Sequence, residues 1–100
     1  MDNAAIKYYS HGIQLSPDIS ELYYYRGISY QKKREFEKAI NDFTEAIKLN
    51  PEEPSYYSIR GFIYKETGII EKAKADFLKI LKLEPENKMA KEFLVAIKNL

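Results

Sequence analysis

Apolar residues recur along the chain at the three- and four-residue spacing of amphipathic helices. One segment places Tyr23, Gly27 and Tyr30 at this spacing, and the next does the same with Phe36, Ala39, Ile40, Phe43, Ala46 and Ile47. Because an α-helix has about 3.6 residues per turn, such residues lie on one face of a helix. The pattern predicts an all-α fold with about six helices, over residues 2–15, 20–33, 36–49, 54–67, 70–83 and 87–99.

The chain repeats itself at an offset of 34 residues. Residues 20–53 and 54–87 are identical at 13 of 34 positions without a gap, whereas chance would give about two identities. The same offset places Ala5 on Ala39 and Pro17 on Pro51, so residues 1–19 match the second half of a unit. We therefore predict one domain, residues 1–100, that consists of a half repeat with the second helix only (1–19), two full repeats (20–53 and 54–87) and a C-terminal capping helix (88–100).

Proline and glycine mark the ends of the predicted helices. Pro17, Pro51 and Pro85 follow the second helix of each unit. They are predicted to end these helices, because proline has no amide hydrogen and disfavours a helical conformation in the residue before it. Gly68 stands at the tight turn inside the later hairpin, and Arg34 takes its place in the earlier one. Each full unit is therefore predicted to be a helical hairpin.

The residues shared by the two units resemble the tetratricopeptide repeat (TPR). They are Tyr23, Arg26, Gly27, Tyr30, Ala39, Phe43 and Pro51 in the first unit, and Tyr57, Arg60, Gly61, Tyr64, Ala73, Phe77 and Pro85 in the second. The chain departs from the usual pattern with Tyr in place of Trp and Arg in place of Leu. The resemblance implies an α-solenoid with a right-handed superhelical twist, whose first helices line a concave groove for peptides, and a role in protein contacts rather than catalysis.

Small residues and one charged pair recur where the helices of each hairpin should meet. Gly27 and Ala39, and their counterparts in the second unit, allow close approach of the two helices, and the neighbouring aromatic residues fill the space beside them. An Arg at this seam needs a partner for its donors. Since an Asp precedes the Phe in each unit, we predict the ion pairs Arg26–Asp42 and Arg60–Asp76.

The resemblance also implies which residues line the concave groove. They are Tyr24, Tyr25, Ile28, Lys32, Ser55, Ser58, Ile59, Phe62, Lys65, Glu66, Met89 and Phe93. Tyr25, Ile59 and Phe93 are spaced 34 residues apart, and with Ile28 and Phe62 they would form an apolar band on the groove. Such a band is typical of an interaction site, although packing between adjacent helices would explain the same residues.

A subset of the family grips the C-terminal carboxylate of heat-shock chaperones with Lys, Asn and Arg side chains. In one register these clamp positions fall on Tyr24, Ile28, Ile59, Met89 and Phe93, and in the other they include Tyr25, Ser55 and Ile59. None of these residues is Lys, Asn or Arg. We therefore expect the partner to be a protein or peptide that is apolar rather than an acidic C-terminal tail.

Composition narrows the possible functions further. The formal net charge of +1 offers no field for nucleic acid or an anionic membrane, and no apolar run reaches the ~20 residues needed to span a bilayer. The chain has no Cys, and His11 is its one histidine, so we expect no metal site, no cofactor and no catalytic site, that is, not an enzyme. The N-terminal residues lack a secretory signal pattern, and we expect a cytoplasmic adaptor or scaffold protein.

The first helix leaves a second function open. Ala5 and Tyr9 occupy positions that face the other helix of the hairpin in the later units, and no such helix precedes them in this sequence. Either the chain is part of a larger repeat array, or a second copy packs on this surface as in a homodimer through the first helix. A structural role in self-association is therefore the alternative to peptide binding.

Overall fold

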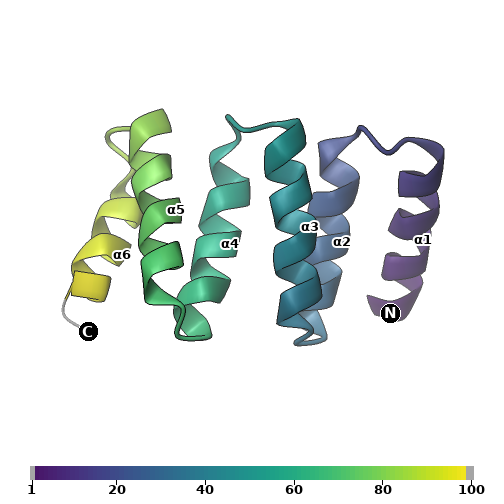
Figure 1. Cartoon of the computed structure of the whole chain (residues 1–100), viewed down its shortest axis with the longest axis horizontal. Helices are drawn as coiled ribbons and strands as arrows, with labels where there is room; N and C mark the ends of the chain where they lie inside the picture. Colours follow the sequence, from purple (N-terminus) through teal and green to yellow (C-terminus); the bar gives the residue numbers. More distant parts are fainter. Residues whose placement is uncertain (1, 99–100) are drawn as a thin grey trace. The chain divides into compact units, whose positions relative to one another are not determined.

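The computed structural model describes residues 2–98, and these residues form six α-helices and no strand. The helices are α1 (Asp2–Leu15), α2 (Ser20–Lys32), α3 (Phe36–Leu49), α4 (Pro54–Glu66), α5 (Ile70–Leu83) and α6 (Lys88–Lys98) (Figure 1). The predicted all-α fold with six helices is confirmed, and residue 99 of the last predicted helix lies outside the described residues. The chain divides into two compact units between Pro51 and Glu52, and each is described by itself.

The turns inside the two hairpins have the same backbone geometry. Arg34 has a φ of 62° and Gly68 a φ of 82°, so the backbone of both residues is in the left-handed conformation. The amide of Glu35 donates to the Tyr30 carbonyl at 2.9 Å, and that of Ile69 donates to Tyr64 at 2.8 Å, as in the common glycine-type end of a helix. Because the chain turns here, α2 and α4 end one residue earlier than predicted, at Lys32 and Glu66.

The first unit is built around α2, which packs on both α1 and α3. Neighbouring helices of the unit run in opposite directions (Figure 1). Phe43 of α3 is fully buried, as are Ala39 and Ala46 on the same helix. The glycine at position 27 allows this approach, because a Cβ atom there would lie only 2.7 Å from the Phe43 ring.

The second unit repeats this hairpin with α4 and α5, and α6 then packs on α5. Phe77, Ala73 and Ile80 of α5 are fully buried, and Ala90 of α6 is buried with them. Here the contact at the glycine is looser, since a Cβ atom on Gly61 would lie 3.1 Å from the Asp76 Cβ and 3.2 Å from the Phe77 ring. The repeated sequence therefore gives repeated packing with small local differences.

These differences predict opposite outcomes for the same substitution. Gly27→Ala is expected to lower the free energy of unfolding by about 1–3 kcal/mol, because the buried Phe43 ring has no room to move away. Gly61→Ala is expected to be close to neutral, since the gain in helix propensity of about 1 kcal/mol offsets a milder crowding. Urea denaturation of the two variants measures both values, and equal destabilisation of the two would contradict the packing described.

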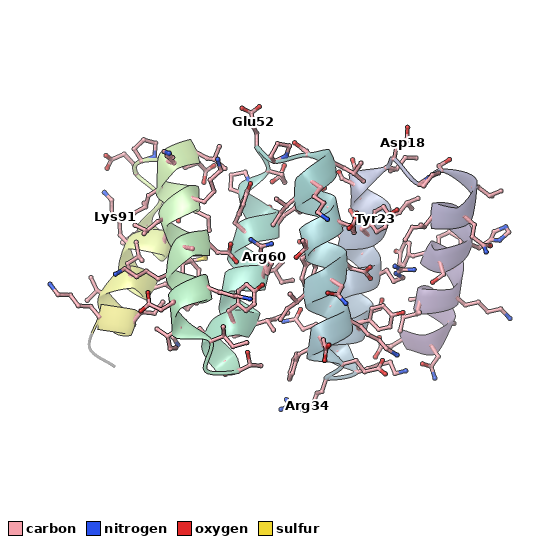
Figure 2. All side chains as sticks on the ribbon, viewed as in Figure 1. Asp18, Tyr23, Arg34, Glu52, Arg60 and Lys91 are labelled. Carbon is pink, nitrogen blue, oxygen red and sulfur yellow. The ribbon has the colours of Figure 1, made fainter. Side chains whose placement is uncertain are left out.

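An Arg–Asp pair joins the two helices of each hairpin. Arg60, midway along α4 in Figure 2, donates from Nε to Asp76 Oδ2 at 2.9 Å and from Nη2 to Oδ1 at 2.6 Å. Arg26 makes the same two bonds to Asp42, at 2.8 and 2.7 Å, and a third from Nη1 to Ser10 Oγ of α1 at 3.1 Å. Burial raises the pKa of the Asp76 carboxyl above its ordinary value, although the hydrogen bonds from Arg60 lower it in part.

Candidate functional site

The second unit brings together aromatic and basic side chains from α4 and α6. The rings of Phe62 and Phe93 meet edge to face with centroids 6.2 Å apart. Lys65, one turn further along α4, places its Nζ 5.4 Å from the centre of the Phe93 ring. Phe93 is held in place from below, because it stacks on the fully buried Phe77 at 4.7 Å with an angle of 6° between the rings.

We call this region the α4–α6 surface and define it by Ser55, Ser58, Phe62, Lys65, Met89 and Phe93. Phe62 and Met89 are each 39% exposed, so apolar area is open to solvent here. A small pocket beside Met89 is lined by Ser55 and Ser58 of α4, by Glu53 and by Glu84. The α4–α6 surface thus combines apolar area, hydroxyl groups and a cation.

Lys65 is half-buried on this surface, and among residues 2–98 it forms no ion pair. Its ammonium group lies over the ring of Phe93, a position that favours the cation. A cation that is held over an aromatic ring without a carboxylate of its own is suited to pair with a carboxylate from outside. This is the chemical property that the second unit offers to a ligand.

The first unit carries a cluster of tyrosines on α1 and α2. Tyr25 stacks on Tyr9 with ring centroids 5.7 Å apart and an angle of 25°, and Tyr24 meets Tyr25 edge to face at 5.4 Å. Tyr24 in turn lies 5.9 Å from the buried Phe43. Tyr25 is 46% exposed, so this cluster has both a buried and an open side.

The structure places the remaining predicted groove residues on the same helices. Ile28 of α2 and Ile59 of α4 are half-buried, whereas Lys32 and Glu66 are exposed near the ends of these helices. Within each unit the aromatic residues come together as pairs and clusters. A single band along both units stays a prediction, as does the right-handed twist of the whole array.

The sequence argument placed Tyr9 on a face of the first helix that no other helix covers, whereas in the structure Tyr9 stacks on Tyr25 of α2. A signal for it exists, because Tyr9 precedes Tyr25 by 16 residues, as Phe77 precedes Phe93. Both are ring-stacking pairs in the structure. An aromatic residue on the second helix of one unit therefore stacks on one 16 residues later, on the first helix of the next unit. A comparison of the chain with itself at an offset of 34 does not reveal this spacing.

We also searched the described residues for a metal site and for a membrane-spanning helix. Across residues 2–98 no group of three or more His, Asp or Glu side chains is placed to hold a metal ion. The described helices also include none long and apolar enough to cross a membrane. His11 is exposed on α1.

Comparison with known proteins identifies the repeats. Two family models, each described as a tetratricopeptide repeat, match residues 20–53 and 54–87. The chain belongs to the tetratricopeptide repeat family. TPR domains are a protein-interaction fold, so the chain is a protein-interaction module. No curated protein sequence matches this TPR chain significantly.

Solved TPR structures similar to the chain include two that hold peptides. The first TPR of Spaghetti (RPAP3) bound to the HSP90 peptide SRMEEVD has 31% identity and a TM-score of 0.90, over 98% of this chain and 78% of that one. The second TPR domain of human RPAP3 in complex with the HSP70 peptide SGPTIEEVD has 34% identity and a TM-score of 0.84, over 93% and 78%. MamA, at 24% identity and a TM-score of 0.93 over 98% of this chain and 57% of that one, shows the fold alone.

These structures correct the prediction about the partner. The sequence argument expected an apolar partner rather than an acidic C-terminal tail, and that prediction is wrong, since similar TPR domains bind peptides that end in EEVD. The argument failed because it searched only the clamp positions for Lys, Asn and Arg. A carboxylate can also pair with a cation elsewhere on the same helices, and the argument did not consider Lys65 of α4 in this way.

Proposed function

We propose that this TPR chain binds an extended, acidic peptide segment of a partner protein on the α4–α6 surface. The observation that carries the proposal is the Lys65 ammonium group poised over Phe93, beside the exposed Phe62. Aromatic anchors next to a charged group are the residues that contribute most to binding at protein interfaces. Phe93 is rigid because it stacks on the core, so little side-chain entropy is lost on binding.

Each part of the surface has a role in this proposal. Lys65 pairs with a carboxylate of the peptide, and its partial burial strengthens the pair relative to one in open water. Phe62 and Met89 contact apolar side chains of the peptide, and the Ser55 and Ser58 hydroxyls lie within reach of its backbone. The peptides held by the similar TPR domains combine acidic residues with Met, Ile or Val, which matches this mixture.

The experiment is a fluorescence anisotropy titration of the chain with labelled SRMEEVD, the peptide held by the similar RPAP3 domain. A control peptide of the same length carries Gln and Asn in place of its Glu and Asp residues and an amide in place of its C-terminal carboxylate. We expect the acidic peptide to bind at least about threefold more tightly, because the pair with Lys65 is lost in the control. The difference should shrink as salt is added. Equal binding of both peptides, or binding of neither, would rule out the proposal.

A further inference from the structure

Apolar side chains are exposed on α1 of the first unit and between α5 and α6 of the second unit. On α1, Tyr8 and Leu15 are each 72% exposed, and no residue of the helix is fully buried. Between α5 and α6 lies a groove lined by Leu78, Leu94 and Ile97, in which Leu78 is 49% exposed. Val95, next to the groove on α6, is 62% exposed. Exposed apolar side chains of this size on neighbouring positions indicate an interaction surface.

The repeat register relates these two surfaces to each other. The 34-residue offset places α1 on α3 and α5, the second helices of the complete hairpins, and it places α6 on α2 and α4, the first helices. Among residues 2–98, α1 is thus a second helix without its first helix, and α6 is a first helix without its second. The exposed Tyr8 takes the position of Asp42 and Asp76, and the exposed Val95 that of Gly27 and Gly61, which lie where the two helices of each complete hairpin meet.

We propose that α1 of one copy packs against α6 of a second copy, along the α5–α6 groove, and that the two helices form a composite hairpin. In the complete hairpins Arg60 meets Asp76, and Arg26 meets Asp42. The corresponding residues of the composite hairpin are Leu94 on α6 and Tyr8 on α1.

The replacement of the Arg–Asp pair by Leu94 and Tyr8 is the reason to expect that a second copy of this chain packs on each open surface. An Arg without its Asp, or an Asp without its Arg, would leave a charge buried at the seam without compensation. This chain has replaced both charges at once, with apolar residues on both sides, and such a replacement keeps the seam stable. A helix that carried the Arg of an ordinary first helix would have no carboxylate to meet at Tyr8.

A second pair of positions is also matched in charge. In each complete hairpin a Lys of the second helix lies over a Tyr of the first, as Lys72 Nζ lies 5.7 Å from the centre of the Tyr64 ring. At these positions the composite hairpin has Ala4 on α1 and Lys98 on α6. The lysine of this pair thus lies on the first helix, as Lys98, and faces Ala4 rather than a second lysine.

Val95 sets how tight the contact is. It takes the position of Gly27 and Gly61, where a Cβ atom would approach the aromatic ring of the second helix to 2.7 and 3.2 Å. The two helices of the composite hairpin must therefore lie further apart than those of a complete hairpin, and the association is weak. Because the two surfaces differ, the contact is head to tail, and each copy keeps one surface of each kind for a further copy.

The test measures the solution mass of the chain by light scattering, from about 10 µM to about 1 mM, a range suited to weak association. We expect the mean mass to rise continuously with concentration. Tyr8→Asp and Leu94→Arg should each abolish the rise, because each introduces one unpaired charge at the seam. An equimolar mixture of the two variants should associate again, since the two substituted residues pair in one composite hairpin and the unsubstituted Leu94 and Tyr8 meet in the next.

Further variants separate the proposal from loss of fold. Val95→Glu changes an exposed residue of α6 and should also keep the chain monomeric with its helix content unchanged by circular dichroism. Leu49→Glu, at an exposed position of α3, is the matched control and should leave the association intact. A wild-type chain that is monomeric over the whole range, or association that Tyr8→Asp abolishes while Leu94→Arg and Val95→Glu do not, would overturn the composite hairpin.

Discussion

Asp76→Ala is expected to lower the free energy of unfolding by about 3 kcal/mol. Asp76 is 3% exposed and accepts two short hydrogen bonds from Arg60. Without the carboxylate, the Arg60 guanidinium stays at the α4–α5 seam with its charge uncompensated, and removal of one partner from such a pair costs about 3–5 kcal/mol when burial is complete. The lower end applies because the Arg60 side chain retains 17% exposure. Urea denaturation monitored by circular dichroism gives the value.

The matching substitution in the first hairpin and a double substitution serve as controls. Asp42→Ala should cost slightly less than Asp76→Ala, because the Arg26 side chain is 21% exposed and the Arg60 side chain 17%. Arg60→Leu combined with Asp76→Leu should recover most of the lost stability, since an apolar pair needs no charge compensation. If Asp76→Ala left the stability unchanged, the pair would make no contribution at the seam.

Substitution of Phe62 and Lys65 together by alanine is expected to weaken SRMEEVD binding by about thirtyfold or more. A loss of about 2 kcal/mol is typical of central interface residues, and this corresponds to a factor of about 30 in affinity. Phe62 supplies exposed aromatic area and Lys65 supplies the cation that pairs with a peptide carboxylate. Both side chains lie toward solvent from the stacked pair of Phe93 and Phe77, so the core is left in place.

The single variants and one control divide this effect into its parts. Lys65→Ala should remove the preference for the acidic peptide over its neutral control, whereas Phe62→Ala should weaken both peptides alike. Leu78→Ala changes an exposed apolar residue on α5, outside the α4–α6 surface, and should bind as the wild type does. Unchanged affinity in the double variant, measured by the same anisotropy titration, would exclude this surface as the binding site.

The two helical hairpins could be predicted because residues 20–53 and 54–87 share the same residue pattern. Tyr30 and Tyr64, or Arg26 and Arg60, recur at one offset without a gap, so that chance is excluded as an explanation. The Arg–Asp pairing was visible for the same reason, since both members recur together. Helix ends were predicted to within one residue because Pro51 and Gly68 restrict the backbone locally.

The surface residues were harder to predict, because their positions depend on contacts between successive repeats. Phe93 is at once a core residue against Phe77 and a surface residue beside Phe62, and its helical position alone does not separate these roles. The cation–ring contact of Lys65 depends on its side-chain conformation, which periodicity does not determine. The partner was mispredicted because the search was restricted to one known arrangement of clamp residues.

The claim that the α4–α6 surface binds the peptide is tested most directly by NMR, with ¹⁵N-labelled chain titrated with unlabelled SRMEEVD. We predict that the largest amide shifts cluster at Ser58, Phe62 and Lys65 of α4 and at Met89 and Phe93 of α6. The amides of α1 should not move. Shifts that cluster at the tyrosines of α1 and α2 instead, or that are absent at saturating peptide, would contradict the account.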